Sequence, residues 1–183
     1  MLKVIKQKYW VFFLILFSVN NALADEKIMD KNVKPLTTQL VMELKVTIGK
    51  TVVVGESDNG SRQYIPITGG EFFGADIAGE KISGEVLAGG ADWQLKRPDG
   101  VLEVDALYSI KTSDGAVIVV HNQGIIVLPE AKDGKSGFPY IRTAPTFHAP
   151  KGKYDWLNKK VFVGTITPAA DGSFVTIRVF VVN

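Results

Sequence analysis

Apolar and polar residues alternate along much of this chain. From Leu40 to Ile48 every second residue is apolar, and most of the residues between them are polar or charged. The segment from Phe174 to Val182 shows the same period, with Val175, Ile177 and Val179 on one face. A period of two is typical of a β-strand with one buried face. Both segments are therefore predicted to be strands.

Turn signals separate further short segments of the same kind. Asn or Asp followed by Gly occurs at Asn59-Gly60, Asp99-Gly100, Asp114-Gly115, Asp133-Gly134 and Asp171-Gly172. Such pairs supply the positive φ angles of tight hairpin turns. The β-rich runs between them are Gln63 to Ile67, Gly70 to Phe73, Lys81 to Leu87, Asp92 to Lys96, Val101 to Lys111, Ala116 to His121, Tyr140 to Phe147 and Val161 to Thr167.

A helical period is absent from the sequence, apart from one turn near Tyr154 to Asn158. Short strands without crossover helices indicate an antiparallel barrel or sandwich. A closed barrel removes exposed strand edges, which a valine-rich chain would otherwise present for aggregation. We therefore predict an all-β fold, a single antiparallel β-barrel of about eight strands connected mostly as a meander.

The first 24 residues have the pattern of a secretory signal peptide. Three lysines precede an apolar run from Tyr9 to Val19, and Ala22-Leu23-Ala24 has the form of a cleavage site. An uncleaved anchor is the alternative, although the run is shorter than the roughly 20 residues that span a bilayer. We expect a signal peptide over 1–24, a flexible arm over 25–38 and a barrel domain over 39–183, in a periplasmic or secreted protein.

Charge limits the classes of partner, and cysteine content limits the sources of stability. The chain carries 21 basic and 19 acidic side chains, and removal of the three leader lysines leaves 18 against 19, a net charge of −1. Because the chain has no basic run, we expect no nucleic-acid partner and, after cleavage, no membrane partner. There is no cysteine, so stability depends on buried apolar surface. Self-association into a homo-oligomer stays open.

Several ordered motifs resemble one family. They are Pro66-Ile67-Thr68-Gly69-Gly70, Gly84-Glu85-Val86-Leu87, Gly89-Gly90-Ala91-Asp92-Trp93, Arg97-Pro98-Asp99-Gly100, Asp105-Ala106-Leu107-Tyr108, Arg142-Thr143-Ala144-Pro145 and Trp156-Leu157-Asn158. Together they resemble the bacterial and fungal domain of unknown function family 3237, over about Leu40 to Val182. The resemblance implies a barrel of about eight strands, similar in architecture to the allene oxide cyclase barrel. It implies no settled activity.

The segment from Gly89 to Gly100 carries the main candidate chemistry. On a strand, Asp92 and Gln94 share one face and Trp93 lies on the other. If the next strand pairs with its polar face on the same side, Glu103 and Asp105 join Asp92 and Gln94. Clustered buried carboxyls repel, which would raise the pKa of at least one and leave a general acid or base. The alternative is that this face points to water.

Arg142 and His121 are further candidates. Arg142 in the lumen would neutralise an acid or clamp a ligand carboxylate, whereas at the rim it would form a salt bridge. His121 could shuttle protons or be a structural residue. His148 reads as a loop residue. The candidate catalytic residues are Asp92, Glu103, Asp105 and Arg142.

Aromatic side chains suggest the walls of a binding site. Tyr154, Trp156 and Asn158 alternate, so they form either a lid over the barrel mouth or a plug that closes it. The candidate ligand-binding residues are Trp93, Gln94, Tyr108, His121, Tyr140, Tyr154, Trp156 and Asn158.

Other classes of site lack their motifs. The sequence has no phosphate loop, His-Glu-x-x-His motif, cysteine pair or Gly-x-Ser-x-Gly elbow, and it has two histidines. No cofactor or metal is therefore expected, although a hard cation on Asp92, Glu103 and Asp105 stays open.

Three functions remain after these exclusions. The leading hypothesis is an exported barrel that binds a small, partly apolar or aromatic molecule in its lumen or mouth. The alternatives are a cofactor-free acid/base isomerase, cyclase or lyase and a structural, self-associating barrel. A lumen filled by side chains would favour the structural hypothesis.

Overall fold

The computed structural model describes residues 33–129 and 138–183. The expected signal peptide and the Asp133-Gly134 turn lie outside these residues. The described strands are β1 (Thr38–Ile48), β2 (Val52–Ser57), β3 (Gly60–Ala75), β4 (Lys81–Val86), β5 (Ala91–Lys96), β6 (Leu102–Thr112), β7 (Val117–Val127), β8 (Tyr140–His148), β9 (Phe162–Pro168) and β10 (Phe174–Val182). A short 3₁₀ helix, η2 (Asp155–Lys159), lies between β8 and β9.

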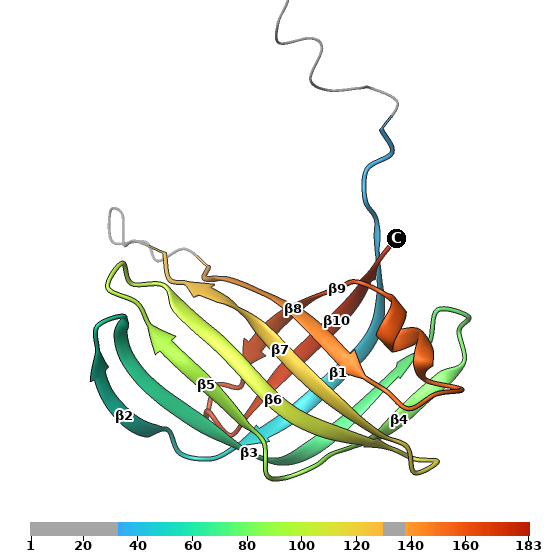
Figure 1. Cartoon of the computed structure of the whole chain (residues 1–183), viewed down its shortest axis with the longest axis horizontal. Coiled ribbons are helices and arrows are strands. Elements are labelled where there is room, and N and C mark those ends of the chain that lie inside the picture. The colour runs from blue at the N-terminus through green and yellow to red at the C-terminus, as the bar shows by residue number, and fades with distance from the viewer. Residues whose placement is uncertain (1–32, 130–137) are drawn as a thin grey trace, which may run out of the picture. The chain divides into compact units, whose positions relative to one another are not determined.

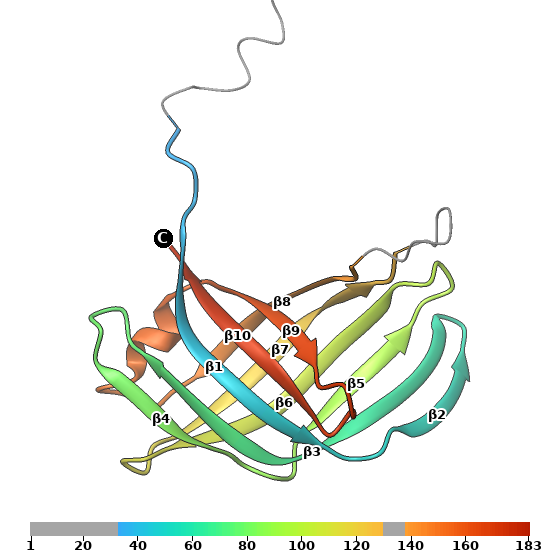
Figure 2. The ribbon, with the colours of Figure 1, turned by 180° about the vertical axis from the view of Figure 1, so that it is seen from behind.

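The strands close into an antiparallel barrel with eight positions (Figure 1). The ring runs β1, β10, β9, β8, β7 and β6, and β3 closes it by pairing with β1. Between β6 and β3, β4 and β5 share one position, because each pairs with both of these strands. β2 pairs with the first half of β3, on the same edge of β3 as β1 (Figure 2). The predicted eight-strand barrel is confirmed.

β3 is longer than the sequence pattern predicts. The two predicted runs on either side of Thr68-Gly69 form one strand of 16 residues. Gly70 has a φ of 138°, and a Cβ built there would lie 2.1 Å from the carbonyl oxygen of Lys45 on β1. Glycine therefore lets β3 approach β1 closely enough to close the ring.

The predicted alternation holds on the closing strands, with one correction. Ile177 and Val179 on β10 are buried, as predicted, and Val181 continues the same buried face. On β1 the register shifts between Leu40 and Met42, so Leu40 is exposed although the pattern placed it on the buried face. A β-bulge explains the difference, because one extra residue reverses the alternation beyond it.

Aromatic side chains fill one end of the barrel. Tyr154 and Leu157 of the η2 segment are buried, and Phe147 packs edge-on against Phe162 with ring centroids 5.0 Å apart. The hydroxyl of Tyr154 donates a hydrogen bond of 2.9 Å to Asp114, in the turn between β6 and β7. η2 and this turn thus lie at the same end of the barrel (Figure 1). None of the described helices has the length and apolarity to cross a membrane.

Candidate ligand-binding site

The other half of the barrel encloses a cavity of about 210 Å³. Most of its wall is aliphatic, from Val46, Ile48, Ile65, Ile67, Val104, Ala106, Ile126, Ile166, Pro168, Val175 and Ile177. The polar lining residues are Asp92, Gln94, Tyr108 and Asn122. None of the described lining residues is a lysine, arginine or histidine. The cavity is therefore an apolar chamber with one acidic group.

Asp92 is held inside by hydrogen bonds to its own wall. Its Oδ1 accepts a hydrogen bond of 2.9 Å from the backbone N–H of Asp105, and its Oδ2 accepts one of 2.6 Å from Nε2 of Gln94. Oε1 of Gln94 in turn accepts a hydrogen bond of 2.7 Å from Nε2 of Gln63 on β3. This chain of amides fixes the position of the carboxyl group at the cavity wall.

The environment of Asp92 favours its neutral form. Burial raises the pKa of Asp92 above 3.8, its ordinary value, because desolvation penalises the charged carboxylate. The hydrogen bonds from Gln94 and the Asp105 backbone lower this pKa, and the charge of Asp105 raises it further. Burial is the largest of these effects. A carboxyl group with a raised pKa in a cavity can both donate and accept a proton.

Tyr108 and Asn122 complete the polar set. Burial raises the pKa of Tyr108, so its phenol stays protonated and can donate a hydrogen bond. Asn122 is 1% exposed, and its Oδ1 accepts no hydrogen bond within the part of the chain that the structure describes. Unpaired buried oxygens are uncommon in folded proteins.

Glu103 and Asp105 do not join Asp92 in the cavity, so the predicted carboxyl cluster is wrong. In the β5–β6 pair, Asp92 lies opposite Ala106, and Glu103 lies opposite Leu95. The even-numbered residues of β6 therefore face inward, and both acids face outward. Because side chains alternate along a strand, this register puts Asp92 on the inner face of the wall and Glu103 and Asp105 on its outer face.

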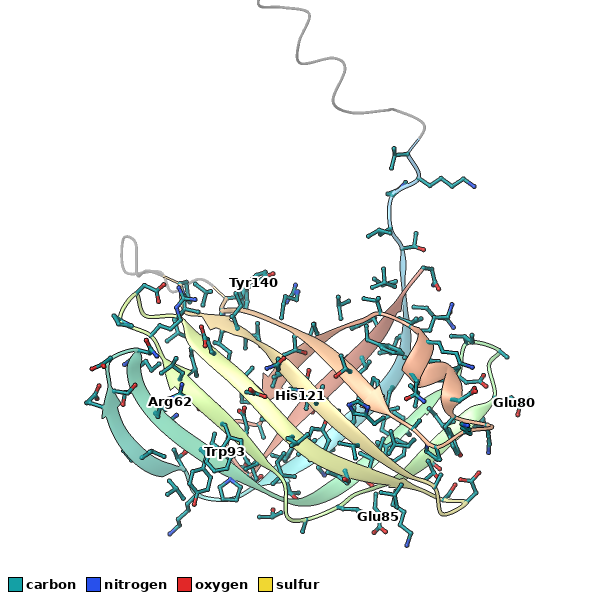
Figure 3. The ribbon with its side chains drawn as sticks, in the orientation of Figure 1. Arg62, Glu80, Glu85, Trp93, His121 and Tyr140 are labelled. Atoms are coloured by element: carbon teal, nitrogen blue, oxygen red, sulfur yellow. The ribbon has the colours of Figure 1, made fainter. Side chains whose placement is uncertain are left out.

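His121 is on the outer wall with Asp105. Its Nε2 lies 2.6 Å from Oδ1 of Asp105. The other carboxylate oxygen of Asp105, Oδ2, accepts a hydrogen bond of 3.1 Å from Nε2 of Gln123. Figure 3 shows His121 on β7 and Trp93 on β5, on the side of the barrel turned to the viewer. Trp93 is 52% exposed, with its ring centroid 4.6 Å from that of Tyr64. Neither residue lines the cavity.

Arg142 and Tyr140 are also outside the lumen. The guanidinium of Arg142 lies 5.2 Å from the centroid of the Tyr140 ring and donates to the carbonyl of Ile141 at 2.7 Å. On β8 the buried residues are Ile141, Thr143, Pro145 and Phe147, so the side chain of Arg142 points outward. His148 is the last residue of β8 and is exposed, instead of lying in the loop.

The segment with Tyr154, Trp156 and Asn158 was predicted to be either a lid over the barrel mouth or a plug that closes it. In the structure it is a plug. Tyr154 is buried in the core, and Trp156 packs on Phe162 at a centroid distance of 5.9 Å. Asn158 is exposed, where its side chain bonds both the N–H and the carbonyl of Ala149. None of the three lines the cavity.

Among the predicted residues, Asp92, Gln94 and Tyr108 thus meet at one cavity. Sequence reasoning missed Asn122 and Gln63. The sequence did carry a signal for Asn122, because this residue continues the alternation of the buried positions Ile118 and Val120 on β7. In residues 33–129 and 138–183, no group of three or more His, Cys, Asp or Glu is placed to hold a metal ion.

Comparison with known proteins gives relatives of similar length. The UPF0311 protein of Rhodopseudomonas palustris is 40% identical over 144 residues, which cover 74% of this chain and 91% of that one. A hydroalkoxylation enzyme of Penicillium herquei is 30% identical over 131 residues, 72% of this chain and 74% of that one.

Solved structures share the fold. The crystal structure of a Rhodopseudomonas palustris protein of unknown function has a TM-score of 0.71 and 38% identity, and covers 82% of this chain and 100% of its own. A β-barrel-like protein of Acinetobacter baumannii also has a TM-score of 0.71, with 28% identity over 84% of this chain and 100% of that one. The family described as "Protein of unknown function (DUF3237)" matches residues 36–182. The chain therefore belongs to this family.

Proposed function

We propose that the barrel binds a small, uncharged and largely apolar molecule in its lumen. The observation that carries this proposal is the cavity, with its aliphatic wall and single carboxyl group. Ligand sites are commonly apolar cavities with a few polar groups that orient the ligand. A purely structural barrel would have this volume filled by side chains.

Size and charge define the class of ligand. An apolar protein cavity of about 150 Å³ holds one benzene molecule, so about 210 Å³ suits one or two small rings. An anionic ligand would lose its hydration without gaining a cationic partner from the described lining residues, beside a group that can itself become negative. Carboxylates and phosphates are therefore poor candidates.

A cavity-filling substitution tests lumenal binding. Ala106 lines the cavity, and the next residue, Leu107, faces outward on the same strand. Ala106→Ile should abolish binding of 2-naphthol, a neutral two-ring probe, as measured by its fluorescence, whereas Leu107→Ile should leave binding unchanged. Equal binding by both variants would show that the probe binds elsewhere and would contradict the proposal.

A second candidate function is proton-transfer catalysis by Asp92. The raised pKa of Asp92 supports it, as does a hydroalkoxylation enzyme among the relatives. Hydroalkoxylation adds an O–H group across a carbon–carbon double bond. The oxygen bonds to one alkene carbon, a proton bonds to the other, and the O–H and π bonds break. A neutral Asp92 would give the carbon its proton and recover one from the hydroxyl, so the cycle balances without an oxidant or reductant.

The cyclisation of 1-(2-hydroxyphenyl)but-2-en-1-one to 2-methylchroman-4-one tests this function. It is an isomerisation on a molecule of suitable size. The wild-type chain should accelerate it above the rate in buffer, and Asp92→Asn should remove the acceleration while the thermal unfolding transition persists. Wild-type acceleration that survives in Asp92→Asn would contradict a proton-transfer role for Asp92.

The cell compartment is a separate part of the proposal. The leader pattern supports export, with a mature protein that begins at Asp25. N-terminal sequencing of the protein isolated from the cells that produce it tests this. A first residue within 1–24 would contradict cleavage at that site.

A further inference from the structure

One row of inward side chains crosses the cavity. Ile65 on β3 pairs with Asp92 on β5, Asp92 with Ala106 on β6, and Ala106 with Asn122 on β7. All four residues line the cavity. Directly paired residues of an antiparallel sheet point to the same face, so this row is continuous.

Ala106 separates the two polar members of the row. Adjacent strands lie about 4.8 Å apart, so Asp92 and Asn122 start roughly 10 Å from each other at their backbones. The methyl group of Ala106 is the only side chain between them in the row. A flat molecule can therefore lie across Ala106, with one edge at Asp92 and the other at Asn122.

The Asn122 end has an unmet hydrogen-bonding requirement. Oδ1 of Asn122 is buried without a donor among the described residues. Leaving such an acceptor unpaired costs free energy, which a ligand recovers if it brings an O–H or N–H group. A ligand with no donor at this edge leaves the cost in place. Asn122 thus discriminates between molecules of equal size.

We propose that Asn122 is a specificity-determining residue that selects uncharged ring compounds bearing an O–H or N–H donor, held across Ala106 with the donor on Asn122 Oδ1. This inference rests on the proposed lumenal binding and adds to it the chemical class of the ligand. It assigns the donor to one named acceptor. The carboxyl group of Asp92 lies at the opposite edge of the bound ring.

Three naphthyl probes of one ring system test this assignment. 2-Naphthol carries a neutral donor, naphthalene carries none, and 2-naphthoate is an anion at neutral pH. Binding to the wild-type full chain is followed by the fluorescence of the ring. We expect 2-naphthol to bind about three- to ten-fold more tightly than naphthalene, the worth of one hydrogen bond. 2-Naphthoate should bind more weakly than both.

Asn122→Leu keeps the number and branching of the side-chain heavy atoms and removes the acceptor. This variant should bind 2-naphthol about three- to ten-fold more weakly than the wild type does, and naphthalene at least as tightly as before. Its thermal unfolding transition reports that the barrel is intact. Equal loss of both probes, or no loss of 2-naphthol, would overturn the assignment to Asn122.

The outcomes separate this inference from the proposed function. If Ala106→Ile abolishes binding of all probes while Asn122→Leu leaves their ranking unchanged, the lumen binds ligands and Asn122 does not select them. Binding of none of the three probes to the wild type would overturn lumenal binding, and the role of Asn122 with it.

Discussion

Asp92 and Asp105 lie on opposite faces of the barrel wall and are joined through it, because the backbone N–H of Asp105 donates a hydrogen bond of 2.9 Å to Oδ1 of Asp92. The carboxylate of Asp105 is outside, beside His121. The charge of Asp105 nevertheless acts on Asp92 by raising its pKa. The outer wall thus contributes to the protonation state of the group inside.

Removing the charge of Asp105 should therefore lower the pKa of Asp92. Asp105→Asn keeps the backbone N–H that bonds Asp92 and removes the like charge. The shift should be small, since the charge of Asp105 is the least of the four influences on this pKa. Carboxyl ¹³C NMR titration of Asp92 measures it. An unchanged or raised pKa would show that the two groups are not coupled by charge.

Asp92 should also make stability depend on pH. Its folded-state pKa is raised, so between 3.8 and that raised value the folded protein keeps a proton that the unfolded chain has lost. The contribution is fully present below 3.8 and is lost as pH rises through the folded-state pKa. Compared with Asp92→Asn, the wild type should therefore lose stability between pH 4 and pH 7.

Urea unfolding of the wild type and of Asp92→Asn at pH 4 and at pH 7 measures this difference. The free energy of unfolding of Asp92→Asn relative to wild type should shift in favour of the variant at the higher pH. A parallel pH dependence in the two proteins would mean that Asp92 titrates normally.

Asn122→Leu should stabilise the protein without ligand. The substitution removes an unpaired buried oxygen, and such groups cost about 1–3 kcal/mol, so a gain of about 1 kcal/mol in the free energy of unfolding is expected. Asn158→Leu is the matched comparison, because Asn158 makes two hydrogen bonds to Ala149 and its loss should destabilise. Thermal unfolding of both variants measures this. Destabilisation by Asn122→Leu would mean that its oxygen is paired in solution.

The plug should be anchored by Asp114. The hydroxyl of Thr112, then Lys153 and the hydroxyl of Tyr154, lower the pKa of Asp114. A depressed pKa contributes stability above 3.8 that is lost as pH falls through the folded-state value. Asp114→Asn and Tyr154→Phe should both lower the melting temperature at pH 7, and the effect of Asp114→Asn should shrink in acid. A melting temperature unchanged in both variants would exclude this anchor.

The fold was predictable because its signals are local. The alternation on β1 and β10 and the Asp-Gly turns depend on neighbouring residues alone, and Gly100, Gly115 and Gly172 have the positive φ that these turns require. β2 was missed because its start, Val52-Val53-Val54, is apolar at consecutive positions and has no period of two.

The candidate site was harder to predict because it depends on register. Residues 97–101 join β5 to β6, and the register through this loop pairs Asp92 with Ala106 instead of an acid. A shift of one residue would have brought both Glu103 and Asp105 inside. Asn122 was missed because the predicted strand ended at His121, whereas β7 continues to Val127.

The position of a bound ligand tests the central claim most directly. Isoleucine methyl groups report on both faces of the wall: Ile48, Ile65, Ile67, Ile126, Ile166 and Ile177 line the cavity, whereas Ile125 lies on the outer surface. In methyl NMR spectra, 2-naphthol should shift the cavity isoleucines together with one dissociation constant and leave Ile125 in place. Shifts at Ile125 with unchanged cavity methyls at saturation would place the ligand outside the barrel and contradict the account.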